Sequence, residues 1–273
     1  MVWVLGKPKL HRRGRKRFHL YYTARCLRYC RPLLIHPYLY LPTCLKMTTS
    51  TDGRPPLTVL SEDELMFRDA VAAFAASEVA PRVKTMERAG KFDQALIPQY
   101  FDLGLMAIEV EERFGGSAGT LMMVTLAVEE LSKIDASAAI VCDVQNTLVN
   151  YPIAHYGTED QKAKYLGMLS SGTLGSYALS EAGSGSDAFA LATRAEKRGS
   201  TYHLNGRKLW ITNGAEAGVY VVFATVDPSA GYKGITAFII ERGFGGFSGG
   251  KKEDKLGIRA SSTVELVLDN CEV

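Results

Sequence analysis

Two short segments in the second half of the chain combine residue types suited to binding a flat, charged cofactor. The first is Tyr177-Ala178-Leu179-Ser180-Glu181-Ala182-Gly183-Ser184-Gly185-Ser186, an apolar run that ends in glycines and hydroxyl residues. Gly183 and Gly185 remove Cβ atoms from the path of a ligand, and the serines offer hydrogen bonds to a ring system or a pyrophosphate. Taken alone, this composition is more often an ordinary Gly/Ser turn between two strands.

The second segment is Lys208-Leu209-Trp210-Ile211-Thr212-Asn213-Gly214, which ends an expected strand with an indole, a hydroxyl group and a turn. An indole in this position could pack beside a flat cofactor, and the threonine hydroxyl could hydrogen-bond to a ring nitrogen. By itself the segment is also compatible with a plain strand and hairpin turn.

These segments need a scaffold, and the first half of the chain predicts helices. Ser61-Glu62-Asp63-Glu64 has the form of a capping box, so a helix is expected from there to about Val79. Pro81 is expected to stop it, because proline lacks the N–H that a helix interior requires. Further helices are expected near Ile97, over 121–134, over 136–155, and after Thr158-Glu159-Asp160-Gln161.

From Gly175 onward the pattern changes to short β-branched runs separated by turn residues, among them Asn205-Gly206. The expected strands are 175–180, 193–196, 202–204, 208–212, 219–226, 235–240 and 263–268. The predicted fold class is therefore α+β, with an all-α domain (57–173) followed by an antiparallel β-barrel or sandwich domain (174–273). A doubly wound Rossmann sheet is disfavoured, because helices and strands are segregated along the chain.

The N-terminal 56 residues differ in charge from the rest. Residues 1–51 hold eleven of the 32 Lys/Arg and none of the 29 Asp/Glu, so the remainder carries 21 basic against 29 acidic residues. An Arg-rich, acid-free start predicts a mitochondrial transit segment. Because it is poor in serine and contains Pro32, Pro37 and Pro42, an artefact of start-site choice stays open, with Met47 as a second possible start.

The remaining composition excludes several classes of protein. The acidic body argues against nucleic acid as a partner. No run reaches the ~18 to 20 apolar residues that a membrane span requires. Cys26 and Cys30 have a spacing that zinc could use, but no second Cys/His pair follows, so no metal site and no disulfide framework is expected.

In this order, after a helical region, the two segments closely resemble the FAD loop and the Trp-Ile-Thr/Ser strand of the acyl-CoA dehydrogenase family. The resemblance covers about 57–273. Further matching runs are Arg113-Phe114-Gly115-Gly116, Leu131-Ser132-Lys133-Ile134-Asp135, His155-Tyr156-Gly157-Thr158, and Lys255-Leu256-Gly257-Ile258-Arg259. One departure is Ser184, where close relatives usually have alanine; this change could add a hydrogen bond near the cofactor.

The resemblance implies FAD as the cofactor. Tyr177 to Ser186 would form the FAD segment, Trp210 to Thr212 the wall beside the flavin ring, and Ser186 and Tyr232 would lie near acyl-CoA. The runs Gln145-Asn146-Thr147-Leu148 and Gly231-Tyr232-Lys233-Gly234 look most like the short/branched-chain members. The implied substrate is then a small acyl-CoA such as 2-methylbutanoyl-CoA, an intermediate of isoleucine degradation.

The implied reaction removes an α-proton with a carboxylate base while a β-hydride passes to FAD, giving a trans-2-enoyl-CoA. The resemblance further implies electron-transfer flavoprotein as electron acceptor, a homotetramer for the complete form, and the mitochondrial matrix as location. The catalytic glutamate is expected beyond Val273, so no base is nominated here, and the chain as given is expected to be inactive. Two alternatives stay open: a non-catalytic protein of the same fold that binds flavin or a partner, and an acyl-CoA oxidase-like specificity.

Overall fold

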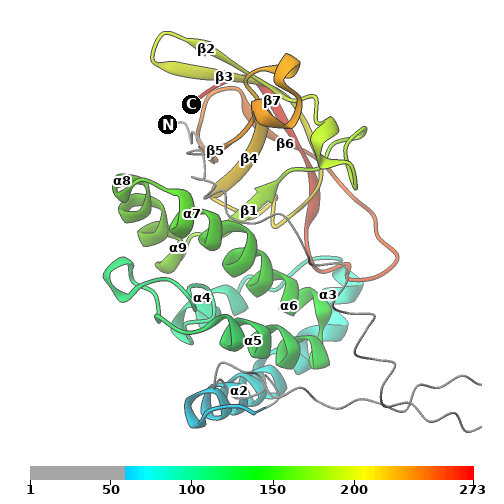
Figure 1. The fold of residues 1–273 in the computed structure, drawn as a ribbon. Coiled ribbons are helices and arrows are strands. Elements are labelled where there is room, and N and C mark those ends of the chain that lie inside the picture. The colour runs from blue at the N-terminus through cyan, green and yellow to red at the C-terminus, as the bar shows by residue number, and fades with distance from the viewer. Residues whose placement is uncertain (1–58) are drawn as a thin grey trace, which may run out of the picture. The chain divides into compact units, whose positions relative to one another are not determined.

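The computed structural model describes residues 59–273, in which a group of helices is followed along the chain by a curled sheet (Figure 1). The predicted basic leader (1–56) therefore lies outside the described residues. The helical segments before the first strand are α2 (Glu62–Phe74), η2 (Ala75–Val79), η3 (Ala80–Arg82), α3 (Val83–Ala89), α4 (Leu96–Asp102), η4 (Glu112–Phe114), α5 (Leu121–Ile134), α6 (Ala136–Asp143), η5 (Val144–Asn150), α7 (Tyr151–Tyr156), α8 (Glu159–Gln161), η6 (Lys162–Leu166) and α9 (Gly167–Ser170).

The sheet follows, with two short 3₁₀ helices in its connections. Its elements are β1 (Gly175–Ala178), η7 (Ala188–Ala190), β2 (Arg194–Arg198), β3 (Thr201–Thr212), β4 (Val219–Thr225), η8 (Pro228–Gly234), β5 (Ile235–Glu241), β6 (Phe247–Lys252) and β7 (Thr263–Glu272). The strand order is β1-β4-β2-β3-β7-β6, and β5 pairs with β4. The predicted order of helices first and strands afterwards is confirmed.

The first helix begins at the predicted capping box but does not end where the sequence predicted. The Ser61 hydroxyl accepts from the Glu64 N–H at 3.2 Å, and the Ser61 N–H donates to the Glu64 carboxylate at 2.8 Å. The expected stop at Pro81 is wrong. The helical stretch continues through the π-helical η2 and the 3₁₀ helix η3 into α3. It ends at Gly90, whose φ is 60°. Proline is tolerated because it sits at the start of the 3₁₀ turn, where its missing N–H costs little.

The long central helices agree with the prediction because their caps are strong. Thr120 caps α5 through a hydrogen bond from the Met123 N–H at 3.2 Å, and Asp135 caps the next helix through the Ser137 N–H at 3.2 Å. Segment 121–134 is confirmed, and the predicted helix over 136–155 is α6, η5 and α7 in succession.

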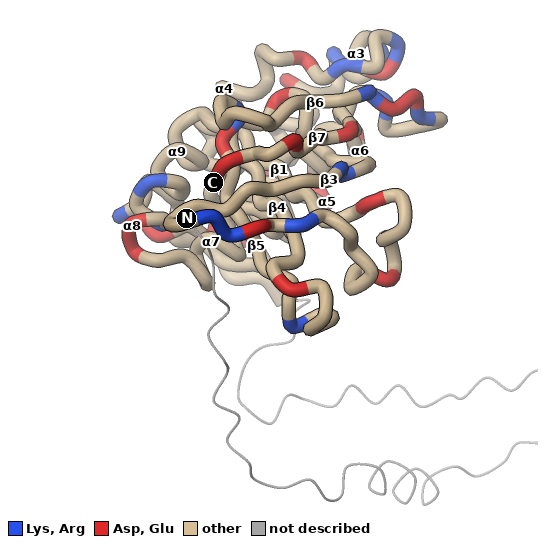
Figure 2. Tube along the Cα trace, turned by 90° about the horizontal axis from the view of Figure 1, so that it is seen from above, with Lys and Arg blue, Asp and Glu red and all other residues tan. Residues whose placement is uncertain are grey.

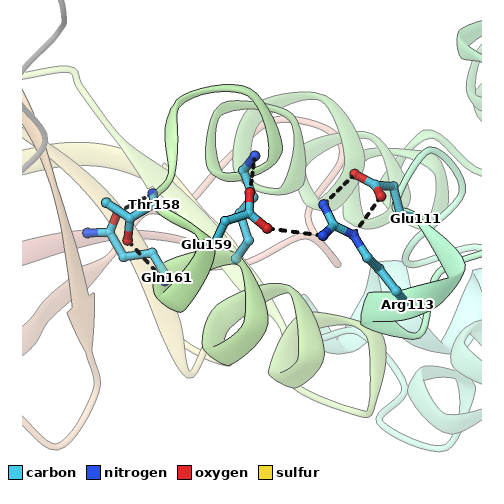
Figure 3. Close-up of polar contacts among 6 residues, drawn as sticks. Glu111, Arg113, Thr158, Glu159 and Gln161 are labelled. Atoms are coloured by element: carbon cyan, nitrogen blue, oxygen red, sulfur yellow. Dashed lines mark hydrogen bonds and ion pairs between the residues drawn. The ribbon is translucent and has the colours of Figure 1, made fainter.

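A polar cluster joins the loop around η4 to α8 (Figure 3). Thr158 and Gln161 form a reciprocal capping box, with hydrogen bonds of 3.2 and 2.9 Å. The Arg113 guanidinium lies 2.7 Å from Glu111 and 3.1 Å from Glu159. Glu111, Arg113 and Glu159 are exposed, whereas Gln161 is buried, so the ion pairs orient the two segments more than they stabilise the fold.

Most strand pairings are antiparallel, as expected, but β1 pairs with β4 in parallel over four residues. β2 also meets β4 in parallel, at the single pair Arg194 and Thr225. The predicted turn at Asn205-Gly206 is wrong: both residues lie inside the 12-residue β3, at a shift in its register against β7. A Cβ at Gly206 would lie 2.4 Å from the Thr193 hydroxyl oxygen, so this glycine permits a close approach rather than a turn.

The helices pack on the sheet through two buried apolar clusters, and Figure 1 shows α6 and α7 running beneath β1. At the junction, the Gln145 side-chain carbonyl accepts from the Gly175 N–H at 2.6 Å, and its amide donates to the Leu169 and Thr173 carbonyls at 3.0 and 3.1 Å. A Cβ at Gly175 would lie 2.6 Å from Val149. The start of β1 is therefore fixed directly against η5.

Basic and acidic residues are interleaved along β2, whose sequence is Arg-Ala-Glu-Lys-Arg (Figure 2).

Within 59–273, no helix combines the length and the apolar character needed to cross a membrane. The same residues contain no group of three or more His, Cys, Asp or Glu placed to hold a metal ion.

Two thiols in the described region should resist alkylation in the folded protein. Cys142 and Cys271 are buried, and burial raises their pKa values to about 12 and about 11. Because only the thiolate reacts and both groups are protonated at neutral pH, we expect neither to react with iodoacetamide at pH 7.5, and both to react in guanidinium. Peptide-resolved mass spectrometry checks this, and native labelling of Cys142 would contradict the buried position.

Candidate functional site

The loop that follows β1 leaves the sheet and is largely exposed. Gly183, Gly185 and Ser186 are exposed, whereas Ser184 is buried and donates from Oγ to the Asp187 carbonyl at 2.9 Å. A Cβ added at Gly183 or Gly185 would meet no heavy atom within 4 Å. The loop backbone is thus accessible to a ligand, and the extra hydroxyl of Ser184 is used inside the loop.

Trp210 lies next to this loop in the fold. The Leu209 N–H donates to the Ser180 carbonyl at 2.9 Å, which brings β3 alongside the end of β1. The register of β3 against β7 shifts between Lys208 and Ile211, and Trp210 adopts a φ of 58°. A left-handed conformation is uncommon for a bulky residue, and such outliers cluster at functional sites. The bulge leaves the indole 53% exposed.

The end of β3 is anchored below this indole. Ile211 is buried, and the Thr212 carbonyl accepts from the Ser176 hydroxyl at 2.6 Å. Asn213 donates from its amide to the Gly175 carbonyl at 3.3 Å. The flat ring therefore projects from a fixed strand, as a binding surface requires.

An apolar pocket of about 270 Å³ lies on the other side of β1, where Tyr177 points. The Tyr177 ring centroid lies 5.1 Å from that of Phe223, and burial raises the Tyr177 pKa. The pocket is lined by residues of η5, α7, β1, β4 and the start of β5: Thr147, Leu148, Tyr151, Pro152, Ile153, Tyr156, Tyr177, Val221, Phe223, Ile235, Thr236, Ala237 and Ile239. None of these lining residues is Asp or Glu.

Tyr232 is linked to the loop by a ring contact. It lies on η8, is 60% exposed, and its ring centroid is 5.5 Å from that of Phe189, which is 69% exposed on η7. Lys233 lies with its Nζ 5.9 Å from the Tyr232 ring centroid. Two exposed aromatic rings and a cation thus stand together beside the loop.

The structure brings the predicted residues together in part. Residues 180–186 and Trp210 share one surface, Tyr232 joins it through Phe189, and Tyr177 faces the pocket behind the strand. Leu179 is half-buried, and Ala178 is fully buried and serves packing. Glu181, which the resemblance places in the FAD segment, is buried and pairs with Lys208 at 2.6 Å.

Sequence reasoning did not nominate Lys208 or Phe189. A lysine at an inward position of a strand was the available signal for Lys208, because such a position needs a buried partner. Phe189 followed a loop already singled out, but an isolated exposed aromatic carries no signal of its own.

The residues present fit a large flat ligand with a polar tail. Trp210 supplies an exposed ring, Thr212 a hydroxyl-bearing side chain at the strand end, and Gly183 and Gly185 an unobstructed backbone. The N-terminus of a helix after a Gly-x-Gly-x-x-Gly turn would be the alternative way to hold a dinucleotide, but only the three-residue η7 follows this loop. In this chain the groups available to hydrogen-bond a ligand belong to the loop between β1 and β2.

Family models match two successive parts of the chain. The N-terminal domain of acyl-CoA dehydrogenases matches residues 61–173, and the middle domain matches residues 176–271. A probable short/branched chain specific acyl-CoA dehydrogenase of Dictyostelium discoideum is 53% identical over 80% of this chain and 53% of that protein. The mitochondrial short/branched chain specific enzyme of Rattus norvegicus is 47% identical over 84% of this chain and 53% of that protein.

Several solved structures are similar to this chain. Butyryl-CoA dehydrogenase from Megasphaera elsdenii is 42% identical, with a TM-score of 0.76 over 79% of this chain and 57% of that chain. A chain in a structure of the electron transferring flavoprotein of Acidaminococcus fermentans is 43% identical, with a TM-score of 0.77 over the same shares. A glutaryl-CoA dehydrogenase from Mycobacterium smegmatis in complex with FADH2 is 32% identical, with a TM-score of 0.73 over 78% and 54%.

The chain spans about half the length of the curated relatives it matches. The two domain models together cover most of the sequence, and the helical region followed by a curled sheet agrees with the acyl-CoA dehydrogenase fold. The chain belongs to the acyl-CoA dehydrogenase family.

Proposed function

We propose that this protein binds FAD between the loop 180–186 and the strand end Trp210–Thr212, and takes part in α,β-dehydrogenation of a short or branched acyl-CoA. The observation that carries the proposal is the meeting of loop and strand through the Leu209–Ser180 hydrogen bond of 2.9 Å, which sets the exposed Trp210 indole beside a glycine-containing loop. An exposed aromatic ring beside an unobstructed loop suits a flat redox ring, and the separate apolar pocket that Tyr177 lines suits a small acyl chain.

Each group has a role in this proposal. The Trp210 indole would pack against the flavin ring, Thr212 would hydrogen-bond to it, and Ser186 with the loop backbone would hold its polar part. FAD, when bound, supplies the acceptor for the β-hydride. Tyr177 and the other pocket residues would exclude water from the acyl chain, while Ser186 and Tyr232 would contact the CoA portion.

The α-proton requires a carboxylate base, and the pocket lining contains no Asp or Glu. We propose that the base belongs to the part of the family's sequence that this chain does not cover. Residues 59–273 alone are then expected to bind cofactor without turning over acyl-CoA.

The finer assignments rest on the named relatives. The Dictyostelium and rat proteins support a short/branched acyl substrate, and the rat protein together with the basic start of this chain supports a mitochondrial location. The Acidaminococcus structure supports electron-transfer flavoprotein as the acceptor. A homotetramer for the complete form is part of the same proposal.

The proposal predicts that the purified chain quenches FAD fluorescence on titration, and that Trp210→Ala weakens FAD affinity by about tenfold. The reason is that a stacked aromatic pair contributes roughly 0.5–1.5 kcal/mol beyond area burial, and about 1.4 kcal/mol corresponds to a factor of ten. Because the indole is 53% exposed, its loss should leave the fold intact, which circular dichroism checks.

Trp210→Phe is the matched control, since it keeps a flat ring and should lose clearly less affinity than Trp210→Ala. Absence of FAD binding by the unaltered chain would refute the cofactor assignment. Oxygen consumption by the complete form with acyl-CoA, in place of reduction of an artificial acceptor, would favour the oxidase-like alternative.

A further inference from the structure

A buried ion pair joins the two segments of the proposed cofactor site. The Lys208 side chain is 0% exposed and the Glu181 side chain 8% exposed, and the lysine Nζ lies 2.6 Å from the glutamate Oε1. Charged side chains are almost never buried to this degree unless they are paired and hydrogen-bonded. The pair therefore has a specific structural task.

The partners of the two groups show what that task is. Lys208 also donates to the Leu179 carbonyl at 3.0 Å, where the chain leaves β1. The Glu181 carboxylate accepts from the Ala192 N–H at 2.6 Å and from the Thr193 N–H at 3.1 Å, where the chain returns toward β2. One lysine and one carboxylate thus hold both ends of the loop 182–191 to β3.

The electrostatics agree with a charged pair. Burial lowers the pKa of Lys208, and the hydrogen bond and charge of Glu181 offset part of that effect. Burial alone would raise the pKa of Glu181, but the hydrogen bonds from Lys208, Thr193 and the Ala192 backbone hold it below its usual range. The charged form of each group is thus favoured by the other.

The position of the lysine connects the pair to the indole. Lys208 lies two residues before Trp210 on β3, at the point where the register shifts, so the clamp sets the distance between the loop and the exposed ring. Between its ends the loop makes an internal bridge, with Glu181 and Ser184 exchanging backbone hydrogen bonds of 2.9 and 3.1 Å. The clamp and this bridge leave residues 185–190 on the outside.

We propose that Lys208 and Glu181 are positioning residues that hold the loop 182–191 in its cofactor-receiving conformation before the cofactor binds. This inference rests on the proposed FAD site and adds that the site is organised in advance by a charge pair that does not touch the ligand. Pre-organisation matters because a loop ordered only on binding consumes part of the binding free energy.

The test uses Lys208→Met, which keeps the apolar stem and removes the charge, and Glu181→Gln, which keeps the size and one acceptor oxygen. The matched control is Arg207→Met on the same strand, because Arg207 forms an exposed ion pair with Glu265 at a similar distance, 2.9 Å, and its side chain is 69% exposed. FAD titration measures affinity. Chymotrypsin cleavage after the exposed Phe189, without FAD, measures loop order directly.

We expect Lys208→Met to lower FAD affinity at least tenfold and to accelerate cleavage after Phe189 at least fivefold. Glu181→Gln should do both to a smaller extent, and Arg207→Met should change neither.

If Lys208→Met proves too unstable to purify, Glu181→Gln still decides the question. Wild-type cleavage rates in Lys208→Met and Glu181→Gln would overturn the clamp whatever the FAD result. Faster cleavage with unaltered FAD affinity would overturn its role in the cofactor site, and a wild-type chain that binds no FAD would instead refute the proposed function.

Discussion

Replacing Asn146 with leucine is expected to lower the free energy of unfolding by about 3 kcal/mol. Asn146 is 2% exposed in the π-helical η5, and its side chain serves both neighbouring segments. Its carbonyl accepts from the Ile108 N–H at 2.9 Å, and its amide donates to the Leu105 and Cys142 carbonyls at 2.7 and 2.9 Å. Leucine has a similar volume but leaves buried backbone groups without partners, at about 1–3 kcal/mol each. Urea unfolding followed by circular dichroism measures the change.

Thr147→Val is the matched control, one residue further along the same turn. Its hydroxyl donates to the Asp143 carbonyl at 2.8 Å, a local bond within the helix that closes no distant segment. Its loss should cost less than about 1 kcal/mol. A loss below 1 kcal/mol for Asn146→Leu as well would mean that the segment 105–108 finds other partners when the amide is absent.

The helix predictions were accurate where the ends of a helix are set by residues close to them in the sequence. The segment 121–134 could be placed because Thr120 caps its start through the Met123 N–H, and because Asp135, directly after it, caps the start of the next helix through the Ser137 N–H. Pro81 was a misleading stop, since the chain changes to π and then 3₁₀ geometry before it. That change depends on packing that buries Val79 completely, which no local pattern reports.

The strand predictions failed where tertiary contacts override local turn chemistry. Asn205-Gly206 is a strong hairpin signal, yet the Asn205 side chain accepts from the Asn270 N–H at 2.8 Å, so the pair forms a bulge against β7. β6 was not predicted, because Gly249 and Gly250 disfavour strands. Its pairing with β7 supplies the backbone hydrogen bonds that composition could not indicate.

The site was predictable as a pair of motifs but not as an assembled surface. Residues 180–186 and Trp210 could be named from residue type, because glycines, serines and an indole at a strand end are local features. The burial of Lys208 against Glu181 joins positions 27 residues apart, and the positive φ of Trp210 follows from a bulge against β7. Both depend on register, which sequence alone does not fix.

Gly116→Ala should be the other strongly destabilising substitution, with an expected loss of about 3 kcal/mol in the free energy of unfolding. A Cβ at this position would lie 2.1 Å from the Val110 carbonyl oxygen and 2.4 Å from the Val110 Cβ. The turn cannot open easily, because the Ala118 N–H donates to the same carbonyl at 2.9 Å and the Gly119 N–H donates to the Ile108 carbonyl at 2.7 Å. Overpacking against buried backbone typically costs 1–3 kcal/mol, or about the upper value where backbone must move.

Gly167→Ala provides a matched comparison with the opposite sign. Gly167 begins α9 with helical angles, φ −57° and ψ −45°, and a Cβ there would meet no heavy atom within 4 Å. Alanine restricts the unfolded chain without strain, so a gain of roughly 0.5–1 kcal/mol is expected. Urea midpoints of the two variants, compared at equal slope, separate steric overlap from the general effect of adding a methyl group. Equal midpoints would contradict the close approach at Val110, because only a relaxed turn could accept the new Cβ at no cost.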